Sequence, residues 1–153
     1  MYKVSRIVDG VIFLMVLSGG FVAGLRAGLI YNTFPLMGDN FIPPDLFVLT
    51  PLWSNFFENM ITVQFDHRII AYILALLIPI FWFRLRRRDV LSRTKKLSSL
   101  LLGLLAIQMT LGVSTLMLHV PTALGVAHQA VGSLLFITSL AVTQSIASRR
   151  GMI

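Results

Sequence analysis

Four long apolar segments constrain this chain of 153 residues more than any other feature of its sequence. A helix of about 20 residues is long enough to cross the hydrocarbon core of a bilayer. With 56% apolar and only 12% charged residues, the chain has too little polar surface for a soluble globular domain. We therefore predict an all-α integral membrane protein, one four-transmembrane-helix bundle over residues 1–153, with spans at about Ile7–Leu25, His67–Leu85, Leu97–Leu118 and Leu124–Ala147.

The basic residues gather at one end of these spans. Eleven of the thirteen Lys and Arg residues lie before the first span, after the fourth, or around the loop 86–96 between the second and third. By the positive-inside rule this end is cytoplasmic and includes both termini. The net charge of +7 is then explained by orientation and by contact with anionic lipid, so we expect a bilayer and no nucleic acid as partner. The expected location is the bacterial inner membrane, with the mitochondrial inner membrane as the alternative.

The outer connection, residues 27–66, is long for a loop in a compact membrane bundle. Loops of this length are usually functional or disordered, and its aromatic content argues against disorder. We predict a cap on the outer face, in which Leu52–Phe65 forms a helix continuous with, or leading into, the second span. The alternative is an aromatic belt that only anchors the protein at the interface. The aromatic residues are Tyr31, Phe34, Phe41, Phe47, Trp53, Phe56, Phe57 and Phe65.

Small residues predict where the helices pack closely, and the lack of cysteine restricts the possible crosslinks and metal sites. Gly19, Gly20 and Gly24 in the first span, and Gly103 and Gly112 in the third, predict close approach of neighbouring helices. Because the chain has no cysteine, disulfides, thiolate metal sites and covalent haem attachment are excluded. Any metal chemistry is left to His, Met and carboxylate groups, and the methionines are expected to be packing residues.

Two histidines enter the bundle by equivalent routes. His67 and His128 each lie near the outer end of a span that runs inward, so they have similar depth. If the last helix starts near Thr122, His128 lies about 9 Å along it. Paired imidazoles at membrane depth fit a hexacoordinate haem iron. Interfacial histidines without a cofactor, another metal site and a proton relay remain alternatives. His119, beside Pro121, is expected to be a solvated loop residue.

Two neighbours of His67 are candidate binding residues. Arg68 could pair with a haem propionate, and a lipid phosphate or Asp66 is an equally good partner for it. Gln64 lies three residues before His67, on the same helical face, and could hydrogen-bond near an iron site. The pattern assigns no catalytic residue.

Three stretches around these residues resemble a known family. The sequences GGFVAGLRAGLIYNTFPLM (Gly19–Met37), NFFENMITVQFDHR (Asn55–Arg68) and ALGVAHQA (Ala123–Ala130) are similar to the carboxyl-terminal half of haem A synthase. The resemblance implies a four-helix half of an eight-helix enzyme, which converts haem O to haem A by oxidising a ring methyl to a formyl group for cytochrome oxidase assembly. It also implies that His67 and His128 ligate a haem b.

The departures from that family matter equally. In the amino-terminal half of such enzymes an acid lies three residues before the equivalent histidine, and here that position is Gln64. Glu58 does not take its place, and Arg26 is atypical. The resemblance implies an oxidoreductase of haem A biosynthesis, but we expect the chain alone to be incomplete for it. It would then need a separate amino-terminal half or a second copy, with haem O synthase as a further candidate partner. A small bis-histidine b-type cytochrome, or a haem-binding assembly factor, is the alternative.

Overall fold

The computed structural model describes residues 1–148 and 151 and consists of helices joined by loops. Four helices are long, α1 (Tyr2–Gly24), α3 (Met60–Arg86), α4 (Ser92–Met117) and α5 (Thr122–Ser148). Three are short, the 3-10 turns η1 (Ala27–Leu29) and η2 (Leu52–Ser54) and helix α2 (Asn55–Glu58). Each long helix is apolar and long enough to cross a membrane. The predicted integral membrane helical bundle is confirmed.

The helices are longer than the predicted spans. They begin five, seven, five and two residues before the expected boundaries at 7, 67, 97 and 124. Hydropathy marks only the part of a helix that is apolar, whereas polar residues carry each helix on beyond the hydrocarbon region. The early start of α3 places His67 two turns inside the helix, and the start of α5 at Thr122 places His128 at the depth considered in the sequence analysis.

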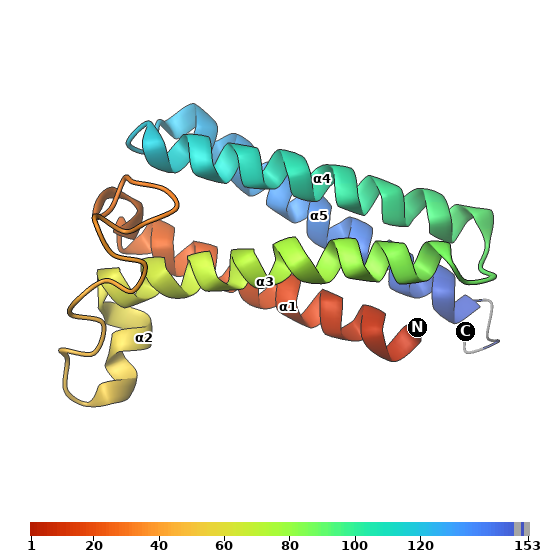
Figure 1. Ribbon diagram of the computed structural model, residues 1–153, viewed down its shortest axis with the longest axis horizontal. Helices are drawn as coiled ribbons and strands as arrows, with labels where there is room; N and C mark the ends of the chain where they lie inside the picture. Colours follow the sequence, from red (N-terminus) through yellow and green to blue (C-terminus); the bar gives the residue numbers. More distant parts are fainter. Residues whose placement is uncertain (149–150, 152–153) are drawn as a thin grey trace.

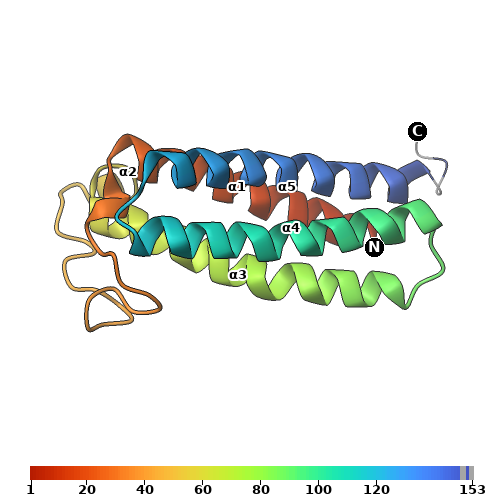
Figure 2. The same cartoon turned by 90° about the horizontal axis from the view of Figure 1, so that it is seen from above.

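The four long helices form an up-down bundle in which α1 packs on α3 and α5, and α4 packs on α3 and α5. Helices α3 and α4 cross at an angle, because they are separated at the outer end in Figure 1 and at the end where α1 begins in Figure 2. Toward the end where α1 begins, Trp82 of α3 donates a hydrogen bond of 3.0 Å to Ser99 of α4. The apolar core lies mainly there, formed by Val8, Ile12, Leu74, Ile78, Phe81, Leu85, Leu101, Leu105, Leu135, Val142 and Ile146.

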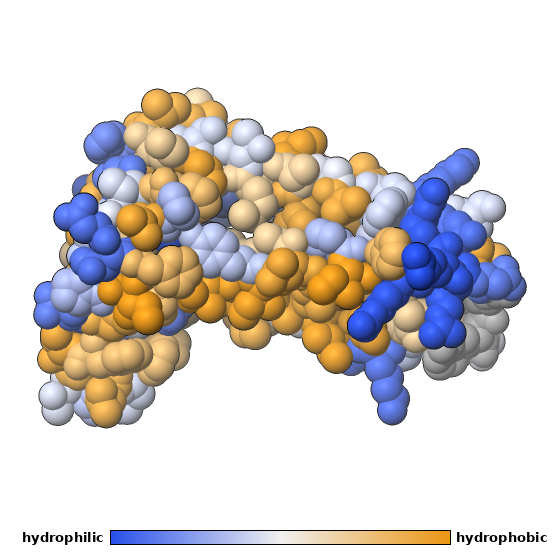
Figure 3. Space-filling model, viewed as in Figure 1, coloured by the Kyte–Doolittle hydropathy of each residue, from blue (hydrophilic) through white to orange (hydrophobic). Residues whose placement is uncertain are grey.

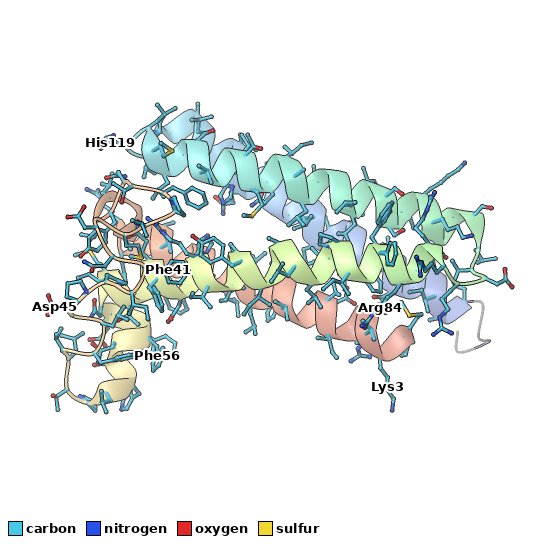
Figure 4. The ribbon with its side chains drawn as sticks, in the orientation of Figure 1. Lys3, Phe41, Asp45, Phe56, Arg84 and His119 are labelled. Carbon is cyan, nitrogen blue, oxygen red and sulfur yellow. The ribbon has the colours of Figure 1, made fainter. Side chains whose placement is uncertain are left out.

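The polar surface follows the predicted charge distribution. In Figure 3 the most strongly hydrophilic residues gather at the end where α1 begins, and smaller hydrophilic patches lie at the opposite end. Lys3 and Arg84 are labelled at the former end in Figure 4. Arg149 and Arg150, which also belong to the predicted basic end, lie outside the described residues. The assignment of this end to the cytoplasm stays a prediction.

The outer loop is only partly a cap. Its first part, residues 31–36, hydrogen-bonds to α3 at the outer end of the bundle. Its second part, with α2, extends sideways beyond the bundle, as Figure 1 shows. Large apolar side chains on this arm are exposed, which suits contact with lipid more than a cap. They are Phe41, Ile42, Phe47, Val48, Leu52, Trp53, Phe56 and Phe57.

Asn59 divides the helix that was expected over Leu52–Phe65. Its side-chain Oδ1 accepts the backbone N–H groups of Ile61 and Thr62, which caps α3. Its Nδ2 donates to the carbonyls of Asp45 and Leu46 at 2.9 and 3.2 Å. Asn59 therefore joins the start of α3 to the loop arm.

Replacing Asn59 with alanine removes the cap and both loop contacts. We expect a loss of about 2 kcal/mol of stability, because one cap and the contacts to two part-buried carbonyls disappear together. Thermal unfolding in detergent, followed by circular dichroism, measures the loss. Asn40→Ala is the control, because the Asn40 side chain is exposed. Equal midpoints for the two variants would show that the Asn59 contacts contribute nothing.

Candidate functional site

A cavity of about 570 Å³ opens in the outer half of the bundle, between the helix pair α1 and α3 and the helix pair α4 and α5. This volume lies within the usual range for cofactor and small-molecule sites. The space-filling view shows the surface hollowed between α3 and α4 in this region (Figure 3). Apolar residues dominate the lining, and the polar side chains among them include Gln64, His67, Arg68, Gln108, His119 and His128.

His67 projects from the second turn of α3 into this cavity. Its Nδ1 lies 2.8 Å from the hydroxyl oxygen of Ser18, on α1. A hydroxyl has a single proton, so if Ser18 donates it to the Met15 carbonyl at 2.9 Å, the hydroxyl oxygen accepts from Nδ1 of His67. The imidazole proton is then on Nδ1, and Nε2 presents its lone pair to a ligand.

His128 projects from α5 into the same cavity. Its Nε2 lies 3.4 Å from Nε2 of Gln108, on α4. Its Nδ1 is buried and has no hydrogen-bond partner among the described residues. Gln108 is thus the polar neighbour of His128, as Ser18 is of His67.

A glycine lies against each imidazole. A Cβ atom added at Gly112 would come within 2.9 Å of Cε1 of His128, and one added at Gly19 within 3.4 Å of Cε1 of His67. The glycines were predicted to let helix backbones approach, but these two make room for histidine rings. At Gly20, Gly24 and Gly103 an added Cβ would meet nothing within 4 Å, so the predicted close packing is wrong there.

Arg68 and Gln64 connect α3 to the outer loop. The Arg68 guanidinium donates to the carbonyls of Tyr31, Thr33 and Leu36 at 2.9, 2.9 and 3.1 Å. Gln64 donates to the same Tyr31 carbonyl at 3.0 Å. Both side chains line the cavity, and Nε of Arg68 and Oε1 of Gln64 are buried without a hydrogen-bond partner in the described part of the chain. A propionate contact for Arg68 stays a prediction.

The remaining candidates lie at the edge of the site or away from it. His119, between α4 and α5, is an exposed loop residue as predicted, and Figure 4 labels it at the outer end. Arg26 is exposed at the rim of the cavity, and Glu58 is exposed in α2. No group of three or more His, Cys, Asp or Glu side chains that could hold a metal ion occurs in the part of the chain that the structure describes. Two imidazoles alone suit a metal that brings most of its own ligands, as haem iron does.

Ser18 and Gln108 are site residues that the sequence interpretation missed. The available signal was their position, because Ser18 directly precedes Gly19 and Gln108 lies one helical turn before Gly112. Polar side chains next to glycines in apolar helices indicate a buried polar site more strongly than the glycines alone.

Comparison with known proteins gives one consistent family. Residues 1–140 match the COX15-CtaA family, described as cytochrome oxidase assembly protein. Heme A synthase of Nitrosospira multiformis is 55% identical over 142 residues, which are 93% of this chain and 40% of that protein. Heme A synthase COX15 of Homo sapiens is 49% identical over 129 residues, 84% of this chain and 31% of that protein.

The chain thus spans less than half the length of these curated relatives. No solved structure matches it. The match of the family over 140 of its 153 residues identifies the chain as a member of the haem A synthase family of cytochrome oxidase assembly proteins.

Proposed function

We propose that His67 and His128 are the axial ligands of a b-type haem, and that this chain is the haem b-carrying part of a haem A synthase. One observation carries the proposal. Two imidazoles from equivalent positions of two antiparallel helix pairs line one cavity, and each ring lies against a glycine. Such a pair supplies the two nitrogen ligands that a hexacoordinate haem iron requires.

The residues of the cavity fit a haem in three ways. The predominantly apolar lining suits the porphyrin faces. The hydrogen bond from His67 to Ser18 leaves a nitrogen lone pair for iron. The unpartnered Nε of Arg68 is a buried donor that a propionate could satisfy. When bound, a haem supplies one-electron redox chemistry, and the protein sets its orientation and potential.

The proposed role is in haem A biosynthesis for cytochrome oxidase, the conversion of haem O to haem A by oxidation of a ring methyl to a formyl group. The curated relatives named heme A synthase are more than twice as long as the matched region. We therefore assign the methyl oxidation to a separate amino-terminal half or a second copy. The amide of Gln64, where that half carries an acid, supports this division. Haem O synthase is a further proposed partner, and the bacterial inner membrane with cytoplasmic termini the proposed location.

A bis-histidine cytochrome or haem-binding assembly factor is the second candidate. It is favoured by the same amide at Gln64, because an uncharged amide is neither an acid nor a base at this position. Co-expression with the amino-terminal half of a haem A synthase separates the two functions. Haem A that forms only when both chains are present supports the synthase role. If no haem A forms, the second candidate is supported.

The haem site is tested by the reduced-minus-oxidised optical spectrum of the purified chain in mild detergent. We expect a low-spin b-type spectrum that is lost in His67→Ala and in His128→Ala. His119→Ala is the control and should keep the spectrum, because His119, although it borders the cavity, is exposed in the loop between α4 and α5 and is not a proposed ligand. A parent protein that binds no haem, or a low-spin spectrum that survives in both variants, would overturn the assignment.

A further inference from the structure

Around His128, each of the helices α4 and α5 places a polar side chain against a glycine of the other helix. The His128 ring lies against Gly112 of α4, and the Gln108 amide lies against Gly132 of α5, where an added Cβ would be 3.0 Å from Nε2 of Gln108. In both helices the polar residue and the glycine are four positions apart, which places them on the same helical face. The contact between Gln108 and His128 is therefore fixed by the packing of two helices.

This contact occupies the ring nitrogen that a ligand would need. Nδ1 of His128 is buried without a hydrogen-bond partner among the described residues, and the Gln108 amide nitrogen, which can only donate, lies 3.4 Å from Nε2. At His67 the situation is reversed. Ser18 engages Nδ1 at 2.8 Å and leaves Nε2 without a hydrogen bond among the described residues.

The other helix pair has no counterpart of Gln108. The position four residues before Gly19 is Met15, and the position four residues after His67 is Ala71, and both line the cavity. A thioether and a methyl group cannot donate a hydrogen bond to an imidazole. The two histidines are thus equivalent in position but differ in what competes for their lone pairs.

We propose that Gln108 is a positioning residue that competes with bound haem for Nε2 of His128, so that His128 is the exchangeable axial ligand and His67 the permanent one. The inference rests on the haem site proposed above. It predicts that the coordination position on the α5 side can open, with the displaced imidazole held by Gln108. A small ligand of reduced haem iron, such as carbon monoxide, then has access to that position.

The test measures two properties of the haem-loaded protein in detergent, the rate of ferric haem transfer to apomyoglobin and the fraction of reduced haem that binds carbon monoxide. In Gln108→Leu we expect about fivefold slower haem transfer, since one competing hydrogen bond is removed, and less carbon monoxide binding. In Ser18→Ala we expect faster transfer, because His67 loses the group that orients it. Gln144→Leu is the matched control, since Gln144 is exposed near the other end of α5, and should change neither property.

The direction of the change in the haem transfer rate shows whether Gln108 competes with haem for His128 or supports the bound state of His128. If Gln108 only supported the fold or the bound state of His128, Gln108→Leu would lose haem faster or at an unchanged rate, and either result would overturn the inference. Gln108→Ala repeats the measurement with a smaller side chain, and circular dichroism shows that both variants are folded. Absence of haem from the parent protein would instead refute the proposed function itself.

Discussion

Replacing Arg68 with alanine is expected to release the first part of the outer loop from the bundle. Arg68 is 8% exposed and donates to three loop carbonyls, those of Tyr31, Thr33 and Leu36. Hydrogen bonds from a charged donor contribute more than neutral ones, so we expect a loss of about 3 kcal/mol or more. Thermal unfolding and hydrogen exchange of residues 31–38 measure the loss of stability and of loop protection.

Arg68→Lys serves as the comparison. Lysine keeps the charge but lacks the planar fork that reaches three carbonyls together, so it should recover only part of the loss. Arg26→Ala is the control for removing an arginine at the outer end, because Arg26 is exposed. If amide protection of residues 31–38 in Arg68→Ala equals that of the parent protein, Arg68 does not hold the loop.

Replacing Gly112 with alanine is expected to remove most haem binding with little loss of stability. The added methyl group would lie 2.9 Å from the His128 ring, so the ring must move. Changes next to a metal ligand typically reduce affinity by about 10- to 100-fold. Alanine is also the better helix former by about 1 kcal/mol, which offsets strain in the fold. Haem titration of the apoprotein measures the affinity, and thermal unfolding without haem measures the stability.

Gly19→Ala is the matched variant on the other helix pair. Its added methyl group would be 3.4 Å from the His67 ring, an ordinary van der Waals distance. We expect its haem affinity to fall much less than that of Gly112→Ala. Similar losses in the two variants would contradict the idea that the spacing around His128 is the tighter one.

The main elements of the fold were predictable because they depend on simple periodic properties. Four apolar segments, a basic end and a long aromatic connection follow from hydropathy and charge, and the structure has the corresponding helices and loop. The shared cavity of His67 and His128 was also predictable, since both residues lie early in helices that run in the same direction. Haem ligation by the pair stays a prediction.

The contacts that tune the site were not predictable from one sequence. Which side chain Gln108 or Ser18 meets depends on the register between helices that are antiparallel neighbours, and hydropathy carries no information on register. The loop contacts of Arg68 were missed for another reason. Backbone carbonyls are present at every residue, so a sequence cannot show which of them a buried guanidinium will reach.

The link between α3 and α4, residues 87–91, is short, whereas His67 lies near the far end of α3. A change in the angle between α3 and α4 at this link therefore displaces the outer end of α3 most. His67 lies 19 residues from Arg86, which is about 28 Å along a helix. A rotation of about 5° about this link would displace His67 by about 2.5 Å, roughly the length of one bond to a metal. The position of His67 is therefore sensitive to the helix angle, whereas residues beside the link would hardly move.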